Sequence, residues 1–229
     1  MAHARNIGTL RSPADQTDLN RKDEALSSII DIRAYVDPSI IPIVVFVDLQ
    51  QEYIASPRAL AIPSASDALV HCRAALTHAR KIGWPIAFVR WTGRSPFFNQ
   101  ATRFSRWIEG FEPTGADMIF ERSRPSCYAS PEFSEVMASS GGNLVLAGFA
   151  GEAACLSTAI DTFHRGHRMT YLTDASASHG LDNMTGSEVH QAVSKVIGLY
   201  GDVMSTKAWI SATSRSRPEY EKPRLVSPG

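Results

Sequence analysis

Short apolar runs alternate along this chain with longer segments in which apolar residues recur at helical spacing. Ile43–Val47 is uniformly apolar, which is typical of a strand buried on both faces of a parallel sheet. The segment from Ser64 or Ser66 to about Ile82 has the apolar periodicity of a helix. Strands that alternate with helices predict a three-layer α/β/α sandwich around a mainly parallel, doubly wound sheet. The other expected strands are 86–89, 118–120, 143–148, 169–174 and an edge strand at 203–204, and the other expected helices are 102–108, 131–138, 152–164 and 188–200.

The periodic part of the chain predicts a single domain over residues 37–211. A length of 229 residues is enough for one domain with a substantial core. Residues 1–36 are expected to form an N-terminal arm in which Lys22–Val36 could be helical. Residues 212–229 are rich in Ser, Pro, Arg and Lys, which is typical of a mobile C-terminal tail.

Charge and cysteine content exclude several functional classes. Lys plus Arg and Asp plus Glu both number 23, so no net charge favours a nucleic acid or a membrane surface as partner. Three scattered cysteines are too few for a disulfide framework or a cysteine-rich zinc site, and a reducing, cytoplasmic location is the simplest expectation. The longest apolar stretch, Ile40–Val47, is interrupted by Pro42 and is far too short to span a bilayer. No secretory signal is visible.

Ligands of doubly wound sheets bind at the carboxyl ends of the strands, which selects a small set of candidate residues. An acid, a guanidinium group and a helix N-terminus with a thiol are expected to converge there. Each has an ordinary alternative: an Asp after a strand is often a helix cap, a single Arg is usually solvated or ion-paired, and a free Cys is more often packing than chemistry. The candidates are Asp48, Arg90, Trp91, Glu121, Arg122, residues 150–155 and Asp174.

The segment after Gly148 is the most informative of these candidates. An apolar strand leads into a tight turn of small residues and then into a helix that opens near Cys155. The N-terminus of a helix offers free N–H groups and a positive dipole end, which favour a thiolate or an oxyanion. This pattern is one way to build a nucleophile site.

The chain resembles the isochorismatase-like hydrolases, also called the cysteine hydrolase superfamily, over roughly residues 40–205. The resemblance implies that Asp48 is a general acid/base and that a Lys four residues before a Ser-Ala-Phe-like triplet polarises the site. It also implies a Cys nucleophile at the helix start, backbone N–H groups beside a cis peptide that hold an oxyanion, and a dimer or tetramer. The matching segments are 44–50, 79–86, 121–122 with 126–128, 144–148 through 158–161, and 166–175.

Two positions depart from this pattern. Arg122 stands where the family has Lys; it keeps the positive charge and can bind a carboxylate bidentately, but it cannot give up a proton. Counted without a gap from Gly148 to Asp161, Ala154 takes the place of the nucleophile and Cys155 that of an aliphatic residue. At about 100° per residue, Cys155 lies at the margin of the apolar stripe of the helix, whereas Ala154 points the other way.

Three functions follow as alternatives. The first is a hydrolase that acts through Asp48 without covalent catalysis on a small carboxylate- or amide-bearing substrate. True isochorismatases resemble the chain here, since they have Gly at the nucleophile position followed by Cys and cleave a vinyl ether by protonation; because their Lys is absent, isochorismate is not assigned as the substrate. The second is a cysteine amidohydrolase that uses Cys155, and the third is a non-catalytic, ligand-binding relative.

The remaining expectations concern the surroundings of the site. Ala150, Gly151 and Ala154 are the expected backbone oxyanion groups, and the substrate pocket is expected to include Gln50, Trp91, Tyr128 and Glu152. No metal is expected, because residues 90–98 lack the His residues with which some nicotinamidase relatives bind zinc. No cofactor is expected, and the only partners predicted are a small-molecule substrate and further copies of the chain.

Overall fold

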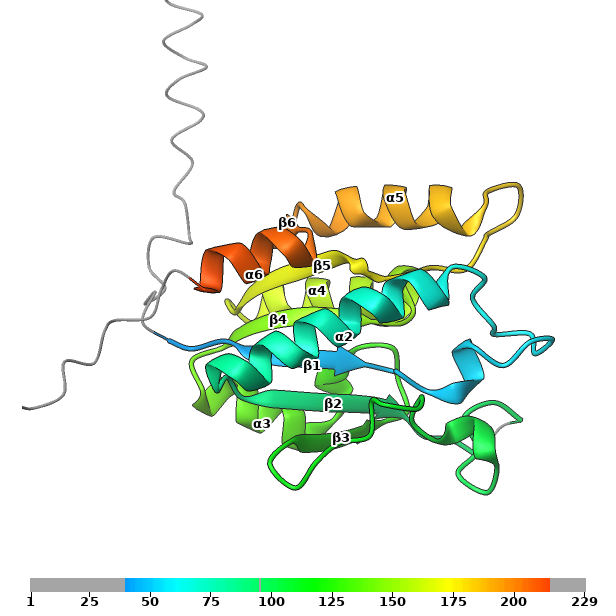
Figure 1. Ribbon diagram of the computed structural model, residues 1–229, viewed down its shortest axis with the longest axis horizontal. Coiled ribbons are helices and arrows are strands. Elements are labelled where there is room, and N and C mark those ends of the chain that lie inside the picture. Colours follow the sequence, from blue (N-terminus) through cyan, green and yellow to red (C-terminus); the bar gives the residue numbers. More distant parts are fainter. Residues whose placement is uncertain (1–39, 95, 215–229) are drawn as a thin grey trace, which may run out of the picture. The chain divides into compact units, whose positions relative to one another are not determined.

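The computed structural model describes residues 40–94 and 96–214, which contain one six-stranded sheet (Figure 1). All of the paired strands are parallel, and their order is β3-β2-β1-β4-β5-β6. The predicted doubly wound α/β sandwich is confirmed. The strands are β1 (Ile43–Val47), β2 (Ile86–Trp91), β3 (Met118–Arg122), β4 (Asn143–Gly148), β5 (Arg168–Ser176) and β6 (Asp202–Met204).

Helices cover both faces of the sheet. One face carries α2 (Ala65–Ile82), which crosses in front of the strands in Figure 1, and α6 (Thr206–Ser214). The other carries α3 (Pro131–Ser139), α4 (Leu156–His164) and α5 (Gly186–Ile197). Short helical turns lie between these elements: the 3₁₀ turns η2 (Gln51–Tyr53), η3 (Arg103–Ser105) and η4 (Cys127–Ala129), and the π turn η5 (Gly151–Cys155).

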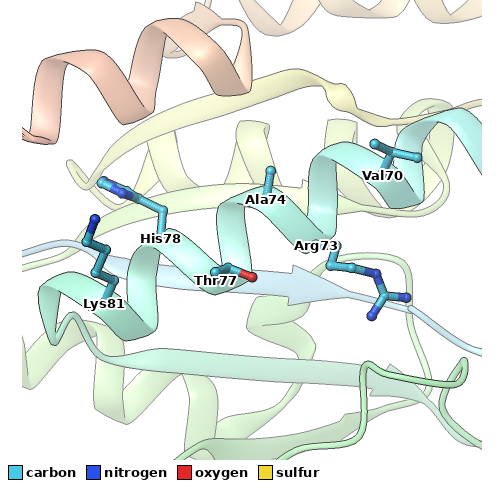
Figure 2. Close-up of a pocket in the computed structure, with 6 residues that line it drawn as sticks. All are labelled: Val70, Arg73, Ala74, Thr77, His78 and Lys81. Carbon is cyan, nitrogen blue, oxygen red and sulfur yellow. The ribbon is translucent and has the colours of Figure 1, made fainter.

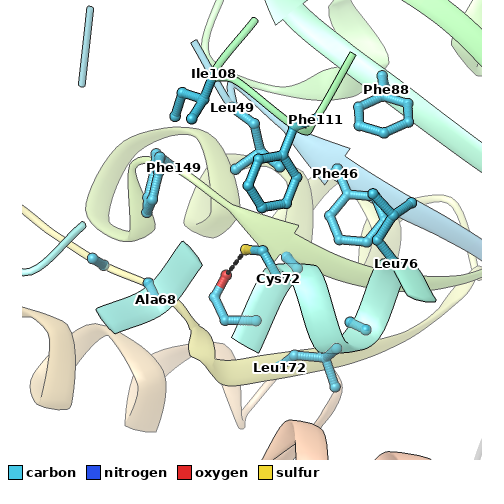
Figure 3. Close-up of a cluster of buried hydrophobic side chains, with 14 of the residues drawn as sticks. Phe46, Leu49, Ala68, Cys72, Leu76, Phe88, Ile108, Phe111, Phe149 and Leu172 are labelled. Carbon is cyan, nitrogen blue, oxygen red and sulfur yellow. Dashed lines mark hydrogen bonds between the residues drawn. The ribbon is translucent and has the colours of Figure 1, made fainter. Parts of the chain in front are cut away.

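The uniform hydrophobicity of β1 follows from its place at the centre of the sheet. Val44 and Phe46 pack in the apolar cluster beneath α2, whereas Val45 and Val47 pack in the cluster beneath α3 and α4. Every residue of β1 is buried, so no position remains for a polar side chain. Figure 3 shows the first cluster, in which the thiol of Cys72 donates to the carbonyl oxygen of Ala175 at 3.1 Å.

The order of the strands reverses between β1 and β4. From β1 the chain builds outward through β2 and β3, then returns to the opposite side of β1 with β4. The carboxyl ends of β1 and β4 therefore flank the crevice in which such sheets bind ligands. Gly148 is the last residue of β4 and has a φ of +117°. A Cβ at this position would lie 2.0 Å from the carbonyl oxygen of Val47, so only glycine fits.

Several predicted boundaries need correction. Residues 212–214, which the sequence suggests belong to the tail, form the end of α6, a helix that was not predicted. The short helix expected at 102–108 is the single turn η3. The predicted arm over residues 1–36 and the rest of the predicted tail, 215–229, lie outside the described residues. Within the described part of the chain, no helix combines the length and hydropathy needed to cross a membrane.

Tertiary contacts rather than apolar periodicity hold α6 in place. Trp209 is buried, and its ring lies edge-on to the rings of His78 and Trp84. The first residue of the helix, Thr206, donates from both its backbone N–H and its hydroxyl to Oδ1 of Asp174, each at 2.7 Å. Asp174 is thus a helix-anchoring residue and does not take part in the site expected at the strand ends.

Candidate active site

A buried ion pair lies at the carboxyl edge of the sheet. Asp48 directly follows β1, and Arg122 is the last residue of β3. Nη2 of Arg122 lies 2.5 Å from Oδ2 of Asp48, although β2 separates the two strands, and the arginine side chain crosses the ring of Trp91 at 4.9 Å from its centroid. The two side chains are 1% exposed or less. The predicted acid and guanidinium group therefore meet, in direct contact.

Burial sets the protonation of this pair. It raises the pKa of Asp48 from 3.8 to about 6, against the opposing pull of the Arg122 charge and of the hydrogen bond from Arg122. Burial is the largest single influence on Arg122 and lowers its pKa, but the charge of Asp48, together with smaller effects of Cys127, Tyr53 and Cys155, raises that pKa overall. A carboxyl group with a pKa near neutrality can both give and take a proton at physiological pH.

The thiol of Cys155 is placed for packing. Its sulfur lies 3.6 Å from the carbonyl oxygen of Gly148 and 3.7 Å from Oγ of Ser176, and the residue is fully buried. Burial raises the pKa of this thiol far above its ordinary value, with smaller effects of neighbouring charges. Reactive cysteines need the opposite shift, so the geometry gives the nucleophile hypothesis for Cys155 no support.

The turn η5 differs from the regular helix start that was expected. A cis peptide joins Phe149 to Ala150, and the π turn then carries one more residue than an α turn would. Ala154 and Cys155 are both buried and belong to the same apolar cluster beneath α3 and α4. The N–H of Gly151 donates to the carbonyl oxygen of Ala177 at 2.9 Å, so it is not free for an oxyanion.

Two predicted pocket residues have structural roles instead. The amide of Gln50 donates to the carbonyl oxygens of Trp91 and Ser105 and accepts from the N–H of Trp91, which uses both of its donor hydrogens. Tyr128 points away from Asp48: its hydroxyl lies 2.9 Å from Nδ1 of His167, at the amino end of β5. Trp91, in contrast, does line the ion pair.

Glu152 lies at the site together with a residue that sequence reasoning missed. Oε1 of Glu152 is 2.7 Å from Nδ1 of His179, and Nε2 of His179 is 3.0 Å from the carbonyl oxygen of Leu60. His179 was missed because the fifth strand was expected to end at Asp174, whereas β5 runs to Ser176. Ligands of such sheets bind at the carboxyl ends of the strands, and the observed end of β5 leads directly to His179.

Aromatic side chains pack together around Tyr53, in the turn η2 that follows Asp48. The ring of Tyr53 lies 5.3 Å from that of Phe98, 5.8 Å from that of Phe149 and 5.8 Å from that of His179, measured between centroids. The carboxylate of the fully buried Glu52, next to Tyr53, accepts from the N–H of Phe98 at 3.4 Å and pairs with Arg58 at 2.5 Å. Because Asp48 and Arg122 are buried, a ligand can reach Asp48 only if surrounding side chains move.

The other candidates from the strand ends lie apart from this site. Arg90 and Glu121 form an ion pair with each other near the outer edge of the sheet. A hollow of about 450 Å³ on the outer face of α2 is lined by residues such as Arg73 and His78 (Figure 2), and a second of about 550 Å³ lies between α5 and the β5–β6 edge. Neither contains Asp48 or Arg122. In ranges 40–94 and 96–214, no group of three or more His, Cys, Asp or Glu residues is arranged to hold a metal ion.

Comparison with known proteins agrees with this architecture. Residues 42–207 match the model of the isochorismatase domain family. The structure is similar to an isochorismatase from Pseudomonas putida KT2440, with a TM-score of 0.69, 23% identity, and coverage of 76% of this chain and 92% of that one. It is also similar to a cysteine hydrolase from Pseudomonas syringae pv. phaseolicola 1448A (TM-score 0.69, 19% identity, 78% and 94% covered). A third similar structure is N-carbamoylsarcosine amidase from Thermoplasma acidophilum (TM-score 0.59, 22% identity, 72% and 96% covered). No curated protein matches the chain.

Proposed function

The chain belongs to the isochorismatase family, and we propose that it is a hydrolase in which Asp48 is the general acid/base and no cysteine acts as nucleophile. One observation carries this proposal: Asp48 has a pKa of about 6 beside Arg122, whereas the thiol of Cys155 is buried and protonated. The position of the family nucleophile holds the methyl group of Ala154. The chemistry left to such a site is proton transfer to the substrate followed by attack of water.

The substrate class that suits this site is a small carboxylate with an acid-labile bond. Arg122 can bind a carboxylate, since Nε of its guanidinium group has no hydrogen-bond partner in the structure. Protonation of the carbon–carbon double bond of a vinyl ether makes the ether carbon open to water without a covalent enzyme intermediate. Amide hydrolysis through Cys155 is less well supported, because it would need a thiolate that burial strongly disfavours.

A second candidate function is a non-catalytic, ligand-binding relative. The observation that favours it is Ala154, a residue without a nucleophilic group, at the position that the resemblance gives to the nucleophile. This candidate requires that Asp48 and Arg122 bind a ligand without transforming it.

Turnover of 2-methoxyacrylate, the simplest vinyl ether of pyruvate, tests the proposal, because its hydrolysis releases pyruvate and methanol. Larger 1-carboxyvinyl ethers and primary amides of small carboxylic acids complete the panel. We expect pyruvate release from the wild type and from Cys155→Ala, and none from Asp48→Asn. Loss of turnover in Cys155→Ala would favour the cysteine mechanism, and no turnover of any compound by the wild type would favour the non-catalytic candidate.

A further inference from the structure

We propose that Glu152, held in place by His179, is the second acid–base group of this site and takes the proton of the attacking water. The inference rests on the proposed function, because it assigns the half of the reaction that Asp48 does not perform. Three observations support it. Glu152 lies at the same edge of the sheet as Asp48, one oxygen of its carboxylate has no hydrogen-bond partner, and the other oxygen contacts His179.

Pairing of β1 with β4 brings the two carboxyl groups to the same edge. Val47 is opposite Gly148 in the register of these strands; Asp48 follows the first, and Glu152 follows the second in the turn η5. Both carboxylates act on the same buried groups. After burial itself, their negative charges are among the causes that raise the pKa of Tyr53 and of Cys155. Glu152 and Asp48 therefore lie at the same edge of the sheet and near the same two buried groups.

Buried polar atoms without a hydrogen-bond partner are concentrated at this edge of the sheet. Over residues 40–94 and 96–214, five buried side-chain polar atoms lack a hydrogen-bond partner, and three of them are Oδ1 of Asp48, Nε of Arg122 and Oε2 of Glu152. A buried polar atom without a partner is costly, so such atoms need an explanation in a native structure. The N–H at Nε of Arg122 suits a bound carboxylate, Oε2 of Glu152 can accept from a water molecule, and Oδ1 of Asp48 can carry the proton that this group transfers.

The contact with His179 fixes which oxygen of Glu152 is free. Nε2 of His179 faces the carbonyl oxygen of Leu60, which can only accept, so Nε2 carries a hydrogen. Nδ1 and Oε1 of Glu152 must then share a second proton across 2.7 Å. Besides Glu152 on η5, the titratable group that faces this imidazole is the phenol of Tyr53 on η2. Oε1 is thereby occupied, whereas Oε2 is buried and has no hydrogen-bond partner.

The proposed steps balance as follows. Protonated Asp48 gives its proton to the terminal carbon of the double bond, and the oxygen of water bonds to the ether carbon while Oε2 of Glu152 takes a water proton. The ether C–O bond of the resulting hemiketal then breaks: the leaving alcohol takes the proton from Glu152, and the remaining hydroxyl returns its proton to Asp48. Vinyl ether and water become ketone and alcohol, and both carboxyl groups regain their starting states.

Chemical rescue separates a base from a residue that only supports the fold. With 2-methoxyacrylate as probe, Glu152→Ala should lower pyruvate release about 10²-fold or more, the usual contribution of a general base. Added formate, which fits the space of the lost carboxylate, should restore part of the rate. Glu135→Gln, a change of an exposed residue on α3, is the matched control and should have the wild-type rate. NMR titration of His179 needs no substrate, and its pKa should fall in Glu152→Gln because Glu152 raises it.

Each of the following results would contradict the role proposed for Glu152. Wild-type turnover that is lost in Asp48→Asn but kept in Glu152→Ala would remove Glu152 from the mechanism and leave the proposed function intact. A folded Glu152→Ala protein that is inactive and not rescued by formate would show a purely structural role. An unchanged His179 pKa in Glu152→Gln would refute the shared proton. Absence of turnover in the wild type would overturn the proposed function and this inference together.

Discussion

Replacement of Asp48 by Asn should stabilise the protein at neutral pH, even though it should abolish turnover. The pKa of Asp48 is raised from 3.8 to about 6 in the folded state, so the folded protein binds this proton more tightly than the unfolded chain does. The stability from this group is fully present below pH 3.8 and is lost as the pH rises through about 6. At about 1.4 kcal/mol for each pH unit, the loss amounts to about 3 kcal/mol at pH 8.

Asn carries no charge at any pH and has nearly the shape of a protonated Asp. The variant should therefore keep the free energy of unfolding that the wild type loses as the pH rises. Urea unfolding between pH 4 and 8 measures this difference. We expect equal free energies of unfolding near pH 4 and an advantage of about 3 kcal/mol for Asp48→Asn at pH 8. Asp182→Asn, the same change on an exposed loop, should show no such pH-dependent gap. A variant that becomes less stable than the wild type as the pH rises would refute the reasoning, because the attraction of Arg122 would then exceed the cost of burial.

Three further changes test other parts of the structure. Cys155→Ala should leave turnover unchanged, and the native wild-type thiols should react with a thiol reagent far more slowly than the unfolded chain, because all three cysteines are buried. Gly148→Ala should destabilise the fold by about 3 kcal/mol or more in urea unfolding, since its Cβ would lie 2.0 Å from the carbonyl oxygen of Val47. Thr185→Ala removes the hydroxyl that caps α5 and should cost about 1 kcal/mol in the same assay, whereas Thr185→Ser should cost less.

The sequence pattern alone was sufficient to predict the elements that are stabilised by local or regularly repeating contacts. The apolar run of β1 reports its burial on both faces, and Gly83, with a φ of +74°, ends α2 where the sequence predicts. Asp48 and Arg122 could be found because the end of a parallel strand is also an edge of the site. Their direct contact could not be predicted, since it depends on the arginine side chain crossing β2.

Features that depend on long-range contacts escaped prediction. Tyr128 was expected in the pocket as an aromatic side chain, but its hydroxyl contacts His167 instead. The helix α6 has too few apolar residues for a periodic signal, and the contacts of Trp209 hold it in place. The spacing of about 100° per residue assumes an α turn, whereas the chain forms a π turn over the residues that include Ala154 and Cys155.

The turn η5 also affects how this site can change over evolutionary time. A π turn absorbs one additional residue locally, so the strand before it and the helix after it can each keep their packing while the number of residues between them varies. A residue gained or lost within 151–155 would therefore change which of these side chains stands at the start of the helix, while β4 and α4 keep their packing. In this chain, the length of one turn is as much a determinant of the chemistry as the identity of the residues in it.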